Sequence, residues 1–381
     1  MKPYLCPCGN TLYFENSRCL ECDREIGYDN AGDRMVDVGP DQPFTRCSNG
    51  VTHGACNWVV PVEEKGNLCP ACVLSSMIPD LSFPNNLELW KLMEQAKRHM
   101  LYSLNRLELP VVDKIKQPET GLAFEFLRPQ PDQPVITGHE KGLITMNLEE
   151  ADDTVRETNR SRLHEPYRTL LGHFRHEVGH YYWYLWYETG ATAPGMLEAF
   201  REVFGDERAD YGAAMKHHYD NGAPAGWENS HISAYSTMHP WEDWAETWAH
   251  YLHICDGLET ARDFNLEQGV KRKAIDLYAP ETAQLPGPLQ GLDPSPFLSL
   301  LHRWIRLSPA LNAVAQSLGH TNIYPFVLST PVVKKLHFIH ACIDTPPIVE
   351  RPQAENTTST PPPDVLKKHE WLKKLFVWKT A

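Results

Sequence analysis

Residues 173–183 read HFRHEVGHYYW and contain the H-E-x-x-H motif His176-Glu177-Val178-Gly179-His180. On a helix, residues four apart lie on one face, so the imidazoles of His176 and His180 converge on one point. Glu177 lies beside them, close enough to reach a water bound to a metal that the histidines hold. Catalytic zinc usually takes three protein ligands and keeps a fourth position open. The motif therefore predicts half of a zinc site, and a third ligand must come from elsewhere in the chain.

The composition is that of a globular protein, with 42% hydrophobic and 22% charged residues among 381. The net charge of −13 disfavours non-specific binding to nucleic acid or anionic lipid. The N-terminal sequence MKPYLCPCGN lacks the basic and then apolar pattern of a signal peptide. No apolar run approaches the roughly 20 residues that span a bilayer. We expect a cytoplasmic protein without a transmembrane segment.

Cysteine is concentrated at the start of the chain, where eight of the ten cysteines lie between Cys6 and Cys72. Cys19/Cys22 and Cys69/Cys72 are C-x-x-C pairs, the spacing of structural zinc sites in reducing compartments. A segment that buries as little as residues 1–78 needs bound metal to supply folding free energy. We therefore predict two structural zinc ions in preference to disulfides, the first held by Cys6, Cys8, Cys19 and Cys22 and the second by Cys47, Cys56, Cys69 and Cys72.

The charge of this cysteine-rich module bears on its partners. Residues 1–78 contain six Lys and Arg against ten Asp and Glu. This balance has the wrong sign for a surface that binds phosphates. We expect no nucleic acid partner, and instead a module that stabilises the protein or docks another protein.

Periodicity in the next part of the chain predicts both helix and strand. Leu89, Leu92, Met93, Ala96 and Met100 recur at helical spacing within residues 86–107. Two strand-like runs follow at residues 122–127 and 142–148. We predict that they form an antiparallel pair whose edge could bind an extended peptide, with an ordinary core sheet as the alternative.

Two downstream segments carry acidic residues at a spacing of four. Asp206 and Asp210 have the relation of a metal ligand and a carboxylate that orients it. Pro240 suits the first turn of a further helix, on which Glu242 and Glu246 share a face. Both Asp206 and Glu242 are therefore candidates for the third ligand.

Three motifs together resemble a bacterial family of zinc-binding metallopeptidases with an N-terminal zinc ribbon. They are HFRHEVGHYYW (173–183), FGDERADY (204–211) and SAYSTMHPWEDWAETWAHYLHI (233–254). The resemblance covers about residues 1–345, and the long tryptophan-rich motif is its most specific part. The chain departs from the family pattern in its first cysteine pair, Cys6-Pro7-Cys8, which is C-x-C where a ribbon normally has C-x-x-C.

A more distant resemblance, to the gluzincin metallopeptidases, favours one candidate. Gluzincins carry a ligand Glu on a downstream helix with an acidic residue four positions later, and Glu242 and Glu246 match this pattern. In one toxin of this group a Tyr precedes the ligand Glu by seven residues, where this chain has Tyr235. The resemblance thus implies Glu242 as third ligand, Glu246 as a partner of a ligand His, and Tyr235 near the reacting oxygen. Asp206 stays open as the alternative ligand, because its segment is similar to a motif of another zincin group.

The expected function is hydrolysis of peptide bonds in a protein or peptide substrate, with one catalytic and two structural Zn²⁺. Glu177 would act as general base, and Tyr235 would donate a hydrogen bond to the developing oxyanion. The alternative is a catalytically silent, zinc-stabilised module that binds protein. An inactive descendant would be expected to lose Glu177 first, since that residue serves chemistry and not folding, and Glu177 is present.

The predicted architecture is α+β and has three parts. Residues 1–78 form a zinc-ribbon module, and residues 79–345 form a mainly helical zincin-like domain with a small antiparallel sheet. Helical patterns near residues 311–318 and 332–343 belong to the second part. Residues 346–381 read as a Pro/Thr-rich linker and a basic-aromatic tail, which could dock to a protein, lie on a membrane surface or pack on its own chain.

Overall fold

The computed structural model describes residues 1–162, 169–269 and 278–345. Helices predominate and the sheets are small, so the α+β class is confirmed. The predicted tail at 346–381 lies outside the described residues. The described chain divides into two compact units, the first comprising residues 1–103, 111–181 and 255–271 and the second residues 104–110, 182–254 and 272–345.

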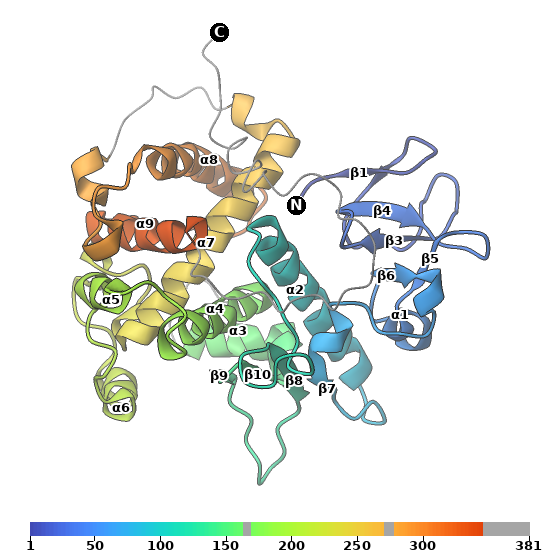
Figure 1. The fold of residues 1–381 in the computed structure, drawn as a ribbon, viewed down its shortest axis with the longest axis horizontal. Coiled ribbons are helices and arrows are strands. Elements are labelled where there is room, and N and C mark those ends of the chain that lie inside the picture. Colours follow the sequence, from blue (N-terminus) through green and yellow to red (C-terminus); the bar gives the residue numbers. More distant parts are fainter. Residues whose placement is uncertain (163–168, 270–277, 346–381) are drawn as a thin grey trace. The chain divides into compact units, whose positions relative to one another are not determined.

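The start of the first unit consists of three short antiparallel pairs and one short helix (Figure 1). Their strands are only two to four residues long, because Gly, Asn, Asp and Cys interrupt every apolar run. The pairs are β1 (Tyr4–Leu5) with β2 (Thr11–Leu12), β3 (Ile26–Asp29) with β4 (Arg34–Asp37), and β5 (Phe44–Arg46) with β6 (Val59–Pro61), and the helix is α1 (Ser48–His53).

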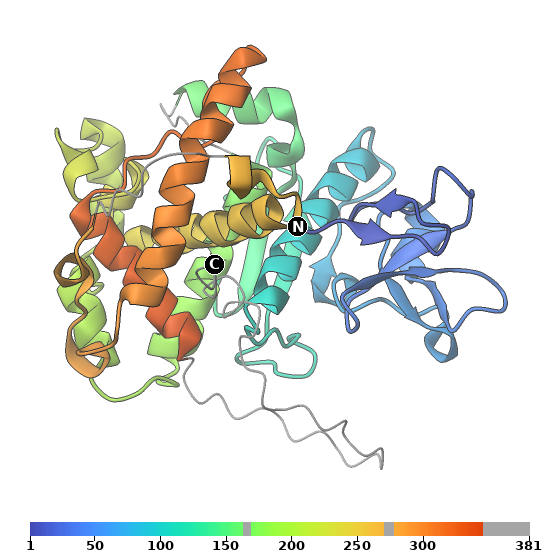
Figure 2. The ribbon, with the colours of Figure 1, turned by 90° about the horizontal axis from the view of Figure 1, so that it is seen from above.

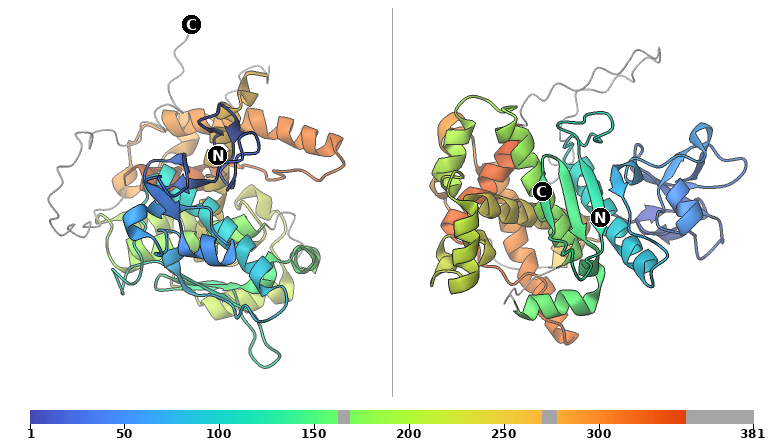
Figure 3. Two further views of the ribbon diagram at one scale, coloured as in Figure 1. Left: turned by 90° about the vertical axis from the view of Figure 1, so that its right-hand side faces the viewer. Right: turned by 90° about the horizontal axis from the view of Figure 1, so that it is seen from below.

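A four-stranded sheet follows in the order β7-β8-β10-β9, whose strands lie side by side in Figure 3. Their bounds are β7 (Ser75–Met77), β8 (Ala123–Leu127), β9 (Gly138–Glu140) and β10 (Leu143–Asn147). Phe124 and Phe126 of β8 are fully buried, and their rings lie 5.7 and 6.2 Å from that of Phe174. This contact packs the helix that carries the H-E-x-x-H motif onto the apolar face of the sheet.

The predicted antiparallel pairing of the two longer strands is wrong. β10 pairs with β8 in parallel, with Phe124 opposite Ile144. The connection between these strands, residues 128–142, is long enough to return the chain to the same end of the sheet, which a parallel pair requires. β10 does have an antiparallel neighbour, the edge strand β9, joined by the two-residue turn Lys141-Gly142 with positive φ at both positions. A Cβ at Gly142 would lie 2.2 Å from a backbone oxygen of Gly121, so this position requires glycine.

The helices agree with the periodicity of the sequence. The helix expected at 86–107 is α2 (Asn86–Arg106), and the pattern near 332–343 is α9 (Thr330–Asp344). The pattern near 311–318 is the last part of a longer helix, α8 (Ser295–Ser317), which crosses α9 in Figure 2 with the Phe297 ring 4.9 Å from that of His337. The others are α3 (Asp153–Arg162), α4 (Leu170–Trp183), α5 (Met196–Phe204), α6 (Tyr211–Asn221) and α7 (Pro240–Asp263).

Aromatic residues form the core of the second unit. A π-helical turn, Tyr184–Glu188, continues directly from α4 and buries Trp186 and Tyr187. The ring of Trp244 on α7 lies 6.1 Å from Trp186 and 5.7 Å from Phe204. Aromatic pairs of this kind add to the free energy gained by burial. They fix α7 within the unit, and with it the acidic residues of its first turn.

None of the helices within the described ranges combines the length and the apolar character that crossing a bilayer requires.

Candidate metal centres

The two histidines of the motif meet on α4, in the first unit. The Nε2 atoms of His176 and His180 are 3.1 Å apart, and the two rings are nearly perpendicular. Two nitrogens that share a tetrahedral zinc at 2.0–2.1 Å lie about 3.4 Å apart. The pair therefore fits a zinc ion with little adjustment. His180 is buried and His176 is half-buried.

Glu177 stands next to this pair on the same helix and is buried. A carboxylate beside two converging imidazoles can take a proton from water and return it to a leaving group. This is the arrangement expected of a general base.

Two partly buried contacts anchor α4 within the first unit. Arg175 donates to Ser103 Oγ at 3.2 Å and pairs with Asp256. His173 contacts the carboxylate of Glu150 through Nδ1. Together these bonds fix both the rotation of the helix and its N-terminal end. Sequence reasoning missed the Arg175 pair, since no short-range spacing connects its members.

Glu242 lies in the first turn of α7, in the second unit, and is 1% exposed. The hydroxyl of Tyr211 donates a hydrogen bond of 2.8 Å to its Oε1. A carboxylate this buried needs charge-assisted hydrogen bonds or a cation, because desolvation penalises the ionised form. Sequence reasoning also missed Tyr211, which is only the last letter of FGDERADY.

Glu246 and Tyr235 also lie in the second unit. Glu246 is half-buried and its Oε2 accepts a hydrogen bond of 2.6 Å from Ser233 Oγ. Tyr235 begins a short 3₁₀ turn, Tyr235–Thr237, and is half-buried, with its ring 5.8 Å from that of His218.

Asp206 and Asp210 lie on the turns between α5 and α6, not on a helix. Asp206 accepts two hydrogen bonds from the Arg208 guanidinium and one from its backbone N–H, and these bonds hold the pKa of the carboxyl well below its usual range. Asp210 caps α6 by accepting from the Ala213 N–H at 3.0 Å. Both carboxylates thus have local structural partners on the surface.

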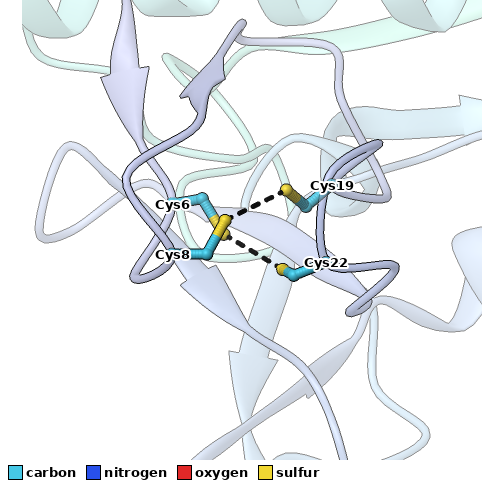
Figure 4. A group of neighbouring side chains, drawn as sticks. All are labelled: Cys6, Cys8, Cys19 and Cys22. Atoms are coloured by element: carbon cyan, nitrogen blue, oxygen red, sulfur yellow. Dashed lines mark hydrogen bonds between the residues drawn. The ribbon is translucent and has the colours of Figure 1, made fainter.

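The first cysteine set comes together on two facing loops (Figure 4). Cys6 Sγ lies 3.6 Å from Cys22 Sγ, and Cys8 Sγ lies 3.7 Å from Cys19 Sγ. Backbone N–H groups, chiefly that of Cys22, lower the pKa of Cys19 to about 6, which favours the thiolate that zinc requires. The C-x-C spacing of Cys6 and Cys8 is therefore compatible with a four-sulfur cluster.

The second set, Cys47, Cys56, Cys69 and Cys72, is buried throughout. Cys56 Sγ and Cys69 Sγ are 3.6 Å apart. The backbone N–H of Cys69 donates to Cys47 Sγ at 3.2 Å, and that of Trp58 donates to Cys56 Sγ at 3.4 Å. Four sulfurs around zinc at 2.3 Å are about 3.8 Å apart, whereas a disulfide needs about 2.0 Å. Both sets have the separations of a closed zinc site.

Comparison with known proteins agrees with this geometry. Residues 86–342 match the model of a family described as "Putative zinc-binding metallo-peptidase", and residues 3–83 match that of a zinc-ribbon domain. The chain belongs to the family that carries this description, and it has an N-terminal zinc-ribbon domain. The two matches meet between residues 83 and 86, a few residues beyond the boundary predicted at 78.

The curated relatives include an uncharacterized protein of Mycobacterium bovis and two counterparts in strains of Mycobacterium tuberculosis. Each is 42% identical to this chain over 345 residues, which is 90% of the chain and 96% of the relative. No solved structure matches significantly.

Proposed function

We propose that the protein is a zinc-dependent peptidase that hydrolyses peptide bonds through the H-E-x-x-H motif on α4. The observation that carries this proposal is the convergence of His176 Nε2 and His180 Nε2 at 3.1 Å beside the buried Glu177. A pair of histidines kept only for packing would have no need of a neighbouring buried carboxylate, because removing a charged group from water costs free energy.

The proposed ligand set is His176, His180 and Glu242. Glu242 is supported by its burial, by the hydrogen bond from Tyr211 and by the match of its helix to the gluzincin pattern. Asp206 is less suited, since Arg208 already neutralises it on an exposed turn. His239 is also excluded as a free donor, because its Nε2 contacts the Ala209 carbonyl at 3.1 Å and its Nδ1 accepts from the Trp241 N–H.

Bound zinc supplies Lewis-acid chemistry, which polarises a carbonyl and brings the pKa of a coordinated water towards 7. Glu177 accepts a proton from the attacking water and later donates it to the leaving amine. Tyr235 donates a hydrogen bond to the oxygen of the scissile carbonyl as negative charge develops there, a role commonly worth a few kcal/mol. Glu246 would orient a ligand histidine through its second ring nitrogen.

In the same proposal, each cysteine set holds one structural zinc ion, giving two structural ions and one catalytic ion. Residues 1–78 act as the ribbon, for stability or for docking of protein substrates, and residues 79–345 act as the peptidase. The predicted cytoplasmic location suits cysteine ligands, because a reducing compartment keeps cysteines from forming disulfides.

The experiment is a comparison of wild type, Glu177→Gln and the matched control Glu188→Gln, an exposed glutamate just beyond the same helix. Each is incubated with a proteome-derived peptide library, and its zinc content is measured. We expect Glu177→Gln to keep its zinc and to lose about 10²- to 10⁴-fold or more of the cleavage rate, with the control unchanged. Equal cleavage by Glu177→Gln would refute the mechanism.

The rival function, a silent module that binds protein, makes a different prediction for the wild type. It would bind zinc at all three sites and cleave nothing in the library. The ligand set is tested separately by the zinc content of Glu242→Ala and Asp206→Ala. If only Asp206→Ala lost the third equivalent of zinc, Asp206 would replace Glu242 as the proposed ligand.

A further inference from the structure

The segment FGDERADY, Phe204–Tyr211, contributes no ligand to the proposed site although it is one of the three motifs that mark the family. We propose that this segment supports and positions the carboxylate of Glu242, and that Tyr211 is its positioning residue. The inference rests on the proposed function, in which Glu242 is the third ligand.

Tyr211 reaches Glu242 directly. Its hydroxyl donates to Oε1 at 2.8 Å, and the carboxylate it contacts is 1% exposed. Its ring also lies 5.2 Å from that of His239 and 5.9 Å from that of Trp241, the residues on either side of Pro240 at the start of α7. The side chain is therefore held by packing against the same turn of chain that presents the carboxylate.

The backbone of the segment contacts the start of α7 at two further points. His239 Nε2 lies 3.1 Å from the Ala209 carbonyl oxygen, while His239 Nδ1 accepts from the Trp241 N–H, so the ring bridges the two stretches of chain. Gly205 has φ of +105°, and a Cβ there would lie 3.1 Å from Pro240 Cγ. The segment therefore contacts the start of α7 at Gly205, at Ala209 and at Tyr211.

The charged residues of the segment stabilise its backbone conformation. Glu207 accepts a bidentate pair of hydrogen bonds from Arg201 on α5, and Asp206 does the same from Arg208. Asp210 caps α6, the helix that begins with Tyr211. These bonds fix the two ends of the turn and set the position from which the tyrosine hydroxyl reaches α7.

A hydrogen bond to one carboxylate oxygen restrains rotation of the glutamate carboxylate about the Cγ–Cδ bond. The groups that hydrogen-bond to metal ligands in this way orient them, and their loss typically weakens metal binding by about 10- to 100-fold. The spacing of Asp206 and Asp210 is then a consequence of building the turn and carries no metal chemistry.

The test uses the full-length protein with all its metal. Tyr211→Phe removes only the hydroxyl, and Tyr219→Phe, a largely exposed tyrosine on the same helix, is the matched control. Affinity for the third zinc equivalent is measured by competition with a chromophoric chelator. The visible spectrum is recorded after Co²⁺ replaces that ion, because it reports ligand geometry whether or not the enzyme turns over.

We expect Tyr211→Phe to weaken binding of the third zinc equivalent by about 10- to 100-fold and to shift the Co²⁺ spectrum, with Tyr219→Phe like the wild type. Wild-type affinity and spectrum in Tyr211→Phe, alongside loss of the ion in Glu242→Ala, would overturn this inference and leave the proposed function intact. Retention of the ion in Glu242→Ala would overturn this inference and the choice of Glu242 as third ligand, since Tyr211 would then have no ligand to position, while the peptidase function is tested separately by Glu177→Gln.

Discussion

The proposed ribbon, residues 1–78, and the helical region, residues 86–345, hold their proposed metal ligands by opposite means. In the ribbon the eight cysteines lie on or beside loops between very short strands, and each set is complete within one short stretch of sequence, 6–22 or 47–72. In the helical region the groups lie on helices of 14 and 24 residues and are fixed by contacts distant in sequence, such as Arg175 with Asp256. The ribbon should therefore fail when its metal is lost, whereas the helical region should fail when its buried polar partners are lost.

The largest expected effect is in the ribbon. Cys69→Ser changes a fully buried cysteine of the second set, a proposed zinc ligand. We expect loss of one zinc equivalent and of folding free energy on the order of 10 kcal/mol, since structural zinc of this kind contributes free energy of that size to folding. The measurement is zinc content together with limited proteolysis mapped to residues 1–78. Cys255→Ala, at a buried cysteine outside both sets, should keep all its zinc. If residues 1–78 of Cys69→Ser resisted proteolysis as in the wild type, the contrast between the ribbon and the helical region would be wrong.

In the helical region the matching prediction concerns a buried ion pair. Lys335 Nζ lies 2.5 Å from Asp243 Oδ2 and donates to the Ser230 carbonyl at 2.7 Å, with both side chains almost fully buried. Lys335→Met leaves the carboxylate without its cation and should cost about 3–5 kcal/mol in denaturant unfolding. The double variant Lys335→Met/Asp243→Asn has no buried charge at these two positions and should recover most of that loss. A double variant as unstable as the single one would show that the loss comes from packing.

A third prediction uses the pH dependence of stability. Burial lowers the pKa of His250 from 6.5 to about 4, and its Nδ1 lies 3.1 Å from the Tyr324 hydroxyl. Between these two pH values the unfolded state binds a proton that the folded state does not, so stability falls as pH falls from 6.5 to 4. The full contribution, about 3 kcal/mol, is present above pH 6.5.

The check is the free energy of unfolding of wild type and His250→Leu across that range. The variant should have a shallower slope whatever its absolute stability. His320→Leu, at an exposed histidine of the same region, should keep the wild-type slope. Equal slopes in His250→Leu and wild type would contradict the assignment.

The smallest expected effect is at Gly205. Its φ of +105° is strained for any residue with a Cβ, and Pro240 Cγ would lie 3.1 Å from that atom. Gly205→Ala should therefore destabilise the protein by about 1–2 kcal/mol. Thermal unfolding of the variant measures this effect. Gly222→Ala, at a left-handed glycine with nothing within 4 Å of its Cβ, separates backbone strain from the contact. An equal loss in both would mean that the contact with Pro240 contributes nothing.

The contrast between contacts that are local and contacts that are distant in sequence also determines what could be predicted from the sequence. Cys19/Cys22 and Cys69/Cys72 are recognisable by a fixed local spacing, and His176 and His180 by one helical turn. The periodicity of α2 and α9 was equally clear. Such patterns are recognisable because the residues that interact are also close together in the sequence.

What the sequence concealed depends on contacts between distant segments. The direction of β8 against β10 is set by the path of the connection 128–142, for which no single residue type is diagnostic. Tyr211 meets Glu242 across 31 positions. The spacing of Asp206 and Asp210 suggested a metal ligand with a carboxylate that orients it, whereas the chain forms turns there, because Gly205 and the Asp206–Arg208 bonds set the backbone.

The unequal burial of the two cysteine sets has a consequence for oxidative damage. Cys8 is exposed and Cys22 is half-buried, whereas all four thiols of the second set are buried. Oxidants attack thiolates that solvent can reach, so peroxide should modify the first set while the second persists. Because partners in the first set lie 3.6 and 3.7 Å apart, oxidation there can close disulfides after a small movement and release the zinc ion proposed for that set. The two proposed zinc ions would then be lost in two stages, beginning at the N-terminal end of the chain.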